Sequence, residues 1–409
     1  MHSPDVRAPA LAVWALGVTQ IIGYGTLFYS FAILAPAMSA DLDLPEQWVF
    51  AALSLALFLG SLLAPTAGRM ADRHGAGRVM TVGSAAAALA LAACALAPER
   101  FSFIAALVAM ELASCFVLYA TAFVAIVQIG PVGAQRSITH LTLIAGFAST
   151  IFWPVTTWLH GFLDWRAVYF VFAGLNLIVC LPIHAWLLGL SRRRQMLAPG
   201  LPASAPALAQ AAPLDPAQTR IVFLLMMAGF AIGGLVLSSI LIHMVPLLTA
   251  IGLGTAGTLA ATLFGPSQVA SRLINMLFGG RLSQALLAVI ATLLLAVGLA
   301  VLLATAPSLP GIAAFVVLFG LGSGLVSIVG GTLPLEMFGR RGYGSRVGWM
   351  SAARQFSSSF APFLFALMMA RTSVPVSIGA LWIVAVLGVA VFTAICVAAR
   401  GRPAEAEAA

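Results

Sequence analysis

The sequence contains little charge and no lysine. Of its 409 residues only 8% are charged and 62% are hydrophobic, and the mean hydropathy is +1.07. A soluble domain carries about 25% charged residues and about 45–50% apolar ones. So few charges cannot cover a water-exposed surface, which excludes a secreted enzyme, a nucleic-acid-binding protein and a disordered scaffold. The composition indicates a polytopic membrane protein.

The absence of lysine also limits the chemistry. All 20 basic residues are arginine, so the chain has neither the lysine of a P-loop nor a Schiff-base lysine, although its net charge is +8. The cysteines lie in separate apolar runs without CxxC or zinc-site spacing, and we expect packed free thiols, no metal and no cofactor. They are Cys94, Cys115, Cys180 and Cys396.

Long apolar runs dominate the chain. A helix that crosses a bilayer needs about 20 mostly apolar residues, and twelve runs meet this length: 10–38, 49–67, 79–97, 102–127, 137–159, 167–190, 220–248, 256–278, 284–304, 310–333, 347–370 and 375–399. The runs do not alternate with the period of two that membrane strands require. The expected fold is therefore an all-α membrane protein with twelve transmembrane helices.

The arginines predict the orientation of the chain. With both termini in the cytoplasm, fifteen arginines fall on the cytoplasmic side and only three, Arg100, Arg166 and Arg371, fall on the other. This asymmetry is typical of cytoplasmic loops. We therefore expect a multi-pass protein of the cell inner membrane. The two remaining arginines, Arg272 and Arg354, lie inside predicted spans.

The longest interruption divides the spans into six and six. Residues 191–219 begin with three arginines and continue rich in Ala and Pro, as a cytoplasmic linker does. The domains are then a bundle at 1–190 and a bundle at 220–409 with a short cytoplasmic tail. An offset near 210 places Gly23 over Gly233 and Arg136 over Arg346. These matches indicate two pseudo-symmetric six-helix bundles, an arrangement that many transporters use.

A charged motif lies between the second and third spans. Residues 68–78 read GRMADRHGAGR. This string resembles the signature of the major facilitator superfamily at Gly68, Asp72, Arg73, Gly75 and Arg78. The resemblance implies the superfamily fold for the whole chain and a carrier that works by alternating access. It also implies that these residues form a cytoplasmic gate.

Within this resemblance, Asp72 is expected to bind the start of the eleventh helix, near 344–348, where free N–H groups favour a carboxylate. The alternative is that the motif arginines only set topology. In the second half the offset of 212 places Gln284 where the first half has Asp72. We therefore expect the second half to contain a degraded copy of the motif, without a carboxylate that binds another helix.

A second run indicates a narrower relationship. Residues 334–348, PLEMFGRRGYGSRVG, resemble the connection between the tenth and eleventh helices in the monocarboxylate and oxalate/formate porters. Arg272 falls where that branch places a substrate-facing arginine. The fifth span has Gly146 and Pro154 but lacks the glycine-proline string of drug antiporters, which disfavours drug efflux.

Charged groups inside spans are costly, about 2.5–3.5 kcal/mol on insertion scales, and indicate function. Arg272 shares one face of its helix with Gln268 and Asn275, and an arginine can hold a carboxylate with two hydrogen bonds. Arg354 lies about two turns into the eleventh span. These residues are the predicted substrate contacts. The alternatives are an arginine satisfied by backbone carbonyls or by gate contacts for Arg272, and a cytoplasmic-gate residue for Arg354.

Three further groups of polar residues lie within spans. Glu111 is near the middle of the fourth span, where burial favours a protonated carboxyl group, and His243 is in the seventh. Both are candidates for proton coupling, and Glu111 is also a candidate counter-charge for an arginine. Gln20 and Tyr24 share a face of the first span and are candidate substrate contacts. For each, ordinary hydrogen bonding within the bundle is the alternative.

The predicted function is secondary active transport of a small organic anion, monocarboxylate-like and coupled to protons. The expected partners are the small-molecule substrate, protons and the lipid bilayer, with no nucleic acid, and the expected state is a monomer. One alternative is a proton-driven exporter of drugs or metabolites with the same fold. Another is a membrane enzyme or sensor, which we disfavour because no nucleophile with a partnered base and no long soluble loop is present.

Overall fold

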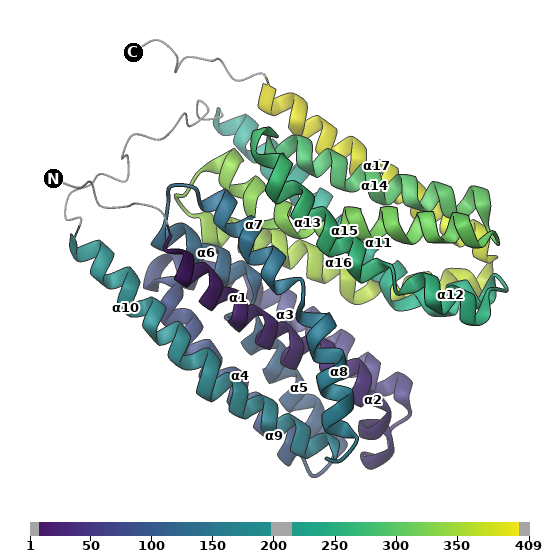
Figure 1. The fold of residues 1–409 in the computed structure, drawn as a ribbon, viewed down its shortest axis with the longest axis horizontal. Helices are drawn as coiled ribbons and strands as arrows, with labels where there is room; N and C mark the ends of the chain where they lie inside the picture. Colours follow the sequence, from purple (N-terminus) through teal and green to yellow (C-terminus); the bar gives the residue numbers. More distant parts are fainter. Residues whose placement is uncertain (1–7, 198–214, 401–409) are drawn as a thin grey trace. The chain divides into compact units, whose positions relative to one another are not determined.

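The computed structural model describes residues 8–197 and 215–400, and these residues are nearly all helical (Figure 1). The chain divides into two compact units. Unit 1 comprises Met1–Ala203 together with Gly342–Ala352, and unit 2 comprises Ser204–Arg341 and Ala353–Ala409. The boundary near 203 and most of the predicted linker 191–219 lie outside the described residues.

Unit 1 is built from six helical spans, several of which are irregular. Its elements are α1 (Ala10–Tyr24), the π-helix η1 (Gly25–Tyr29), α2 (Ser30–Asp41), α3 (Glu46–His74), α4 (Ala76–Leu96), α5 (Arg100–Ser114), α6 (Tyr119–Ile129), α7 (Ala134–Ala145), α8 (Ala148–His160), α9 (Trp165–Leu175), the π-helix η2 (Asn176–Cys180) and α10 (Leu181–Leu197). The fourth span is broken between α5 and α6, and the fifth between α7 and α8.

Unit 2 contains longer uninterrupted helices. Its elements are α11 (Pro216–Ala250), α12 (Gly254–Ala261), α13 (Phe264–Phe278), the 3-10 helix η3 (Gly279–Arg281), α14 (Gln284–Thr305), α15 (Leu309–Phe338), α16 (Tyr343–Arg371) and α17 (Val374–Arg400). The first turns of α16 are counted with unit 1 because their contacts lie there.

Ten helical segments of the described chain are long and apolar enough to cross a membrane. They include Ala10–Asp41 and Arg100–Ile129, which contain the π-helix and the broken helix respectively. The two other predicted spans are also helical. The span at 256–278 is divided between α12 and α13, and the span at 347–370 lies within α16. The prediction of an all-helical membrane fold is confirmed.

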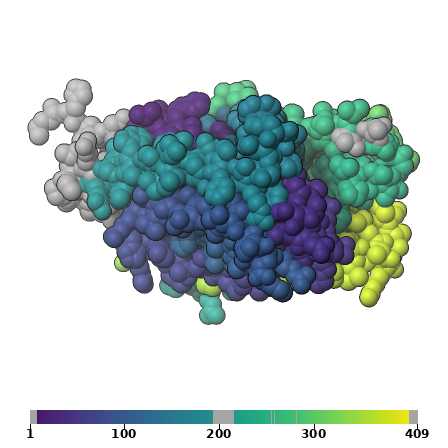
Figure 2. All heavy atoms as spheres, turned by 90° about the horizontal axis from the view of Figure 1, so that it is seen from below, coloured from purple at the N-terminus to yellow at the C-terminus, as the bar shows by residue number. Residues whose placement is uncertain are grey.

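Small side chains explain how the helices of unit 1 approach each other. Helix α4 is rich in alanine and packs against α5, α9 and α10, and the segments of these helices lie side by side on one face of unit 1 (Figure 2). An ideal Cβ on Gly77 would lie 2.8 Å from Cα of Leu188, and one on Gly83 would lie 2.7 Å from Cβ of Phe116. Glycine therefore permits these close backbone contacts.

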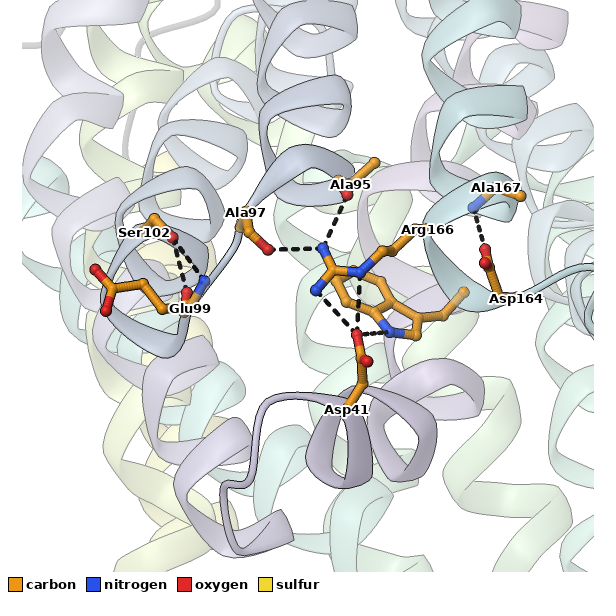
Figure 3. A network of polar contacts seen from close by, with 9 residues as sticks. Asp41, Ala95, Ala97, Glu99, Ser102, Asp164, Arg166 and Ala167 are labelled. Atoms are coloured by element: carbon orange, nitrogen blue, oxygen red, sulfur yellow. Dashed lines mark hydrogen bonds and ion pairs between the residues drawn. The ribbon is translucent and has the colours of Figure 1, made fainter.

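One arginine ties three helix ends together in unit 1 (Figure 3). At the start of α9, Arg166 donates through Nε to Oδ2 of Asp41 at 3.0 Å and forms an ion pair with it through Nη2 at 2.9 Å. Its Nη1 donates to the carbonyls of Ala95 and Ala97 at the end of α4. The indole of Trp165 also donates to Asp41, at 3.0 Å. This arginine thus satisfies carbonyls that a helix end leaves without partners.

Candidate functional site

The predicted gate motif forms the turn between α3 and α4. Gly68, Asp72 and Arg73 lie in the last turns of α3, Gly75 has a φ of +86° and joins the two helices, and Arg78 is in the first turn of α4. A φ of this sign favours glycine, which explains why the turn contains one.

The carboxylate of Asp72 binds the first turn of α16. It accepts hydrogen bonds from the N–H of Gly344 at 2.9 Å and from the N–H of Ser345 at 2.8 Å. These N–H groups have no partner within their own helix, and the positive end of the helix dipole favours an anion there. Two further glycines allow the approach. An ideal Cβ on Gly348 would lie 2.6 Å from the carbonyl oxygen of Ala64, and one on Gly68 would overlap the carbonyl of Gly344.

Gln128, at the end of α6, holds the same turn from the other side and was missed in the sequence. Its Nε2 donates to the carbonyl of Ala71 at 2.9 Å, and its Oε1 accepts from the N–H of Ala76 at 2.8 Å. The amide therefore bridges the end of α3 and the start of α4, directly beside Asp72. Its only signal in the sequence is a polar residue at the end of a span.

The position predicted for Gln284 is wrong. Gln284 is the first residue of α14, and its N–H donates to Oε2 of Glu336 at 2.7 Å. It therefore corresponds to Ala76, the first residue of α4, at an offset of 208. At this offset Gly280, in the 3-10 helix η3, stands in the place of Asp72, and it has no carboxylate.

Arg272 is buried within unit 2, against α15. Its side chain is 4% exposed, and Nε donates to Oγ of Ser327 at 3.1 Å and to the carbonyl of Gly324 at 3.5 Å. One turn earlier, Nε2 of Gln268 donates to Oγ of Ser323 at 2.9 Å. Both predicted contacts thus face the same stretch of α15. The backbone contact to Gly324 agrees in part with the alternative, in which carbonyls satisfy this arginine.

The other two predicted contacts of unit 2 lie apart from this pair. Asn275 is half-buried, and its amide oxygen lies against Gly279 at the end of α13. Arg354 is exposed on α16, and its guanidinium has no hydrogen-bond partner among the described residues. Its backbone carbonyl lies against Gly234 of α11. The two arginines therefore differ, since Arg272 is buried and bonded and Arg354 is not.

Glu111 lies near the end of α5, one turn before the break in the fourth span. It is 3% exposed, and Oγ of Ser114 donates to its Oε2 at 3.4 Å and to its backbone carbonyl at 2.7 Å. Within the described part of the chain no arginine forms an ion pair with Glu111, whereas Arg166 does so with Asp41. The hydroxyl of Tyr169, also buried in unit 1, has no hydrogen-bond partner among the described residues.

The histidines have local partners. Nδ1 of His243 lies 3.1 Å from the carbonyl of Ser239 in its own helix, and its ring packs edge-on against Phe365. His184, which is buried in unit 1, lies between two hydroxyls, with Ser84 2.7 Å from Nδ1 and Thr19 3.0 Å from Nε2. This bridge joins α1, α4 and α10.

Gln20 and Tyr24 both lie beside the break in the fourth span. Gln20 is fully buried, and its Nε2 donates to the carbonyl of Val117 at 2.8 Å. Tyr24 is half-buried, with its ring centroid 4.7 Å from that of Tyr119 and 6.4 Å from that of Tyr29. Sequence spacing placed Gln20 and Tyr24 on one face, but it gave no sign of the break that they contact.

Comparison with known proteins gives the family. Residues 16–287, about two thirds of the chain, match the Major Facilitator Superfamily. The human organic anion transporter MFSD10 (TETRAN) has a TM-score of 0.73 at 13% identity, covering 96% of this chain and 100% of that one. The proton:xylose symporter XylE, bound to 6-bromo-6-deoxy-D-glucose, has a TM-score of 0.69 at 13% identity, covering 93% and 95%.

No curated protein sequence matches the chain. At 13% identity the two solved structures establish the fold alone, and the resemblance to the monocarboxylate branch stays a prediction. The family match and the helical architecture agree with each other, and both indicate a transporter and not an enzyme. The chain therefore belongs to the major facilitator superfamily.

Proposed function

We propose that this chain is a secondary active transporter that moves a small organic anion together with protons by alternating access. The observation that carries the proposal is the burial of Arg272 in α13, within the span predicted at 256–278. An arginine keeps its charge under all physiological conditions and is expensive to place in a membrane. Retaining one there, with a polar neighbour one turn away, is explained by an anionic cargo.

The geometry around Arg272 supports a role in orientation. Ser327 and Gly324 accept from Nε, and the planar guanidinium is thereby fixed against α15. A guanidinium can bind a carboxylate with two parallel hydrogen bonds. In this proposal Arg272 binds the carboxylate, Gln268 and Asn275 line the same helix, and Arg354 supplies a second positive charge.

Glu111 is the proposed proton carrier. It is buried with no cation beside it in the described residues, and desolvation disfavours the ionised form of such a group. Its carboxyl group can therefore bind a proton before cargo enters and release it when its surroundings become wetter. His243 is the second candidate, with weaker support because its ring is already bonded to its own helix.

The two similar solved structures support an anion and a proton as the transported species. One neighbour is described as an organic anion transporter and the other as a proton symporter. The proposal places the chain in the cell inner membrane with both termini in the cytoplasm, because of the asymmetry of the arginines. It also keeps the two bundles at 1–190 and 220–409 with a linker at 191–219.

Uptake into proteoliposomes tests the anion assignment. Arg272→Gln should reduce the uptake of formate, lactate and oxalate at least tenfold under an imposed pH gradient, because the carboxylate loses its charged partner. Arg100→Gln is the matched control, since Arg100 is an exposed arginine in unit 1 that packs over Phe101. Wild-type uptake rates in the Arg272 variant at normal protein yield would contradict the assignment.

A second measurement tests the coupling. Glu111→Gln should abolish acceleration of uptake by the pH gradient while leaving exchange of labelled for unlabelled anion intact, because exchange needs no net proton movement. Loss of both activities would indicate a structural role instead. Export of anion from preloaded vesicles, with no uptake from outside, would favour the exporter alternative.

A further inference from the structure

The break in the fourth span is not explained by its local sequence. Between the end of α5 and the start of α6 the chain reads Cys-Phe-Val-Leu, residues 115–118, which includes no proline or glycine. Sharp helix interruptions usually occur at those residues or where a side chain enters the hydrogen-bond ladder. At the offset of 208 the second half has residues 323–326, which lie inside the continuous helix α15.

Side chains from outside the break occupy it. Nε2 of Gln20 donates to the carbonyl of Val117 at 2.8 Å, and Oγ1 of Thr121 donates to the carbonyl of Cys115 at 3.0 Å. Helix α1 approaches closely here, since an ideal Cβ on Gly23 would lie 3.0 Å from Cδ2 of Leu118. Tertiary contacts therefore hold the fourth span open, and departures from local sequence preference concentrate at functional sites.

The amide of Gln20 is only half satisfied. The residue is 0% exposed, and its Oε1 has no hydrogen-bond partner among the described residues. Because Oε1 and Nε2 are bonded to the same carbon, Oε1 also lies at the break. A buried acceptor without a donor is unfavourable, and each such atom in a native structure needs an explanation. A group that donates a hydrogen bond would satisfy this oxygen.

The surroundings define what kind of group fits. Helix α6 begins at the break, and its N-cap residue, Leu118, makes no side-chain capping hydrogen bond. The positive end of this helix favours an electron-rich oxygen. The rings of Tyr24 and Tyr119 lie beside it with centroids 4.7 Å apart, and the π-helix Gly25–Tyr29 follows Tyr24. Such π-helical segments are frequent at functional sites.

We propose that the break between α5 and α6 is a subsite for a hydroxyl group of the cargo, which donates to Oε1 of Gln20 while its oxygen faces the first turn of α6. A hydroxyl both donates and accepts a hydrogen bond, whereas a carboxylate only accepts and would meet the oxygen of Gln20 unfavourably. The inference rests on the proposed function and narrows it, because the cargo then carries a hydroxyl group.

A comparison of ligands that differ by one hydroxyl tests this subsite. Uptake of 2-hydroxypropanoate and 3-hydroxypropanoate is measured against propanoate in wild type, Gln20→Leu and Gln47→Leu. Wild type should prefer at least one hydroxy acid about tenfold, and Gln20→Leu should abolish the preference while still moving propanoate. Gln47→Leu is the matched control, because Gln47 is an exposed glutamine in the first turn of α3 in the same unit, and it should keep the preference.

The readout is the uptake rate of each hydroxy acid divided by that of propanoate in the same protein, since partial misfolding lowers both rates equally. Equal uptake of all three acids by wild type, or an unchanged preference in Gln20→Leu, would overturn the subsite and indicate a buried water at Oε1. If wild type moves none of the acids, the anion proposal fails, and thermal stabilisation by D-glucose against 2-deoxy-D-glucose decides the subsite. Equal stabilisation by both sugars overturns it as well.

Discussion

The turn between α3 and α4 and the turn between α13 and α14 come from corresponding places in the two halves, but among the described residues only the first binds the start of another helix through a carboxylate. Gly68 precedes the first residue of α4 by eight positions, whereas Gly280 precedes the first residue of α14 by four. The extra helical turn in the first half contains Asp72, which binds the start of α16. A difference of one turn thus decides whether the motif can form a latch.

The side chains that hold the two turns also differ, because one is an amide and the other a carboxylate. Gln128 can donate and accept, so it joins the carbonyl of Ala71 to the N–H of Ala76. Glu336 can only accept, and it binds the N–H groups of Gln284 and Ala285. Because Gln128 is uncharged, Asp72 is the only negative charge in the first turn. In the second turn the carboxylate of Glu336 caps the start of α14.

The largest expected effect comes from filling the contact between α3 and α16. Gly68→Ala places a methyl group on the carbonyl of Gly344, and overpacking of this kind costs about 1–3 kcal/mol, occasionally more. Maleimide labelling of Ser345→Cys, in a background whose native cysteines are serine, should become more than tenfold faster. Gly280→Ala is the control, because no atom lies within 4 Å of its added Cβ; an effect there would remove the contrast between the turns.

A smaller effect is expected from removing charge. Asp72→Asn keeps an acceptor for the start of α16 but loses the interaction of an anion with the helix dipole, about 0.3–2 kcal/mol. Labelling of Ser345→Cys should accelerate several-fold, and high salt should reduce the difference in labelling rate between the Asp72→Asn protein and the protein that retains Asp72. An unchanged labelling rate would mean that hydrogen bonding alone, without charge, holds the two helices.

The smallest effect is expected from giving each turn the side chain that holds the other, by Gln128→Glu and Glu336→Gln. Gln128→Glu loses the donor to Ala71 and brings a second negative charge beside Asp72, which should lower the free energy of unfolding by about 1 kcal/mol. Glu336→Gln keeps an acceptor and should lower it by less, within about 0.5 kcal/mol. Thermal unfolding midpoints of the two variants give the comparison; a greater loss in Glu336→Gln would reverse our ranking of the turns.

The sequence predicted the helices and the motif because both depend on local pattern. Apolar runs of bilayer length and the GRMADRHGAGR string were sufficient for the fold. Prediction from the sequence failed where contacts with residues distant along the chain determine the geometry. Gln128 meets the α3–α4 turn from 52 residues away, and Gln20 meets Val117 from 97 residues away. The predicted position of Gln284 was wrong because the offset between the halves changes from 212 at Gly68 to 208 at Ala76.

The bonds of Arg166 to Asp41, Ala95 and Ala97 have a mechanical consequence. One guanidinium joins the ends of three spans, so we expect those ends to move together whenever unit 1 tilts. A spectroscopic probe attached to any one of them would report the displacement of all three. If Arg166 were replaced by leucine, the same probe would report motion of its own helix end alone.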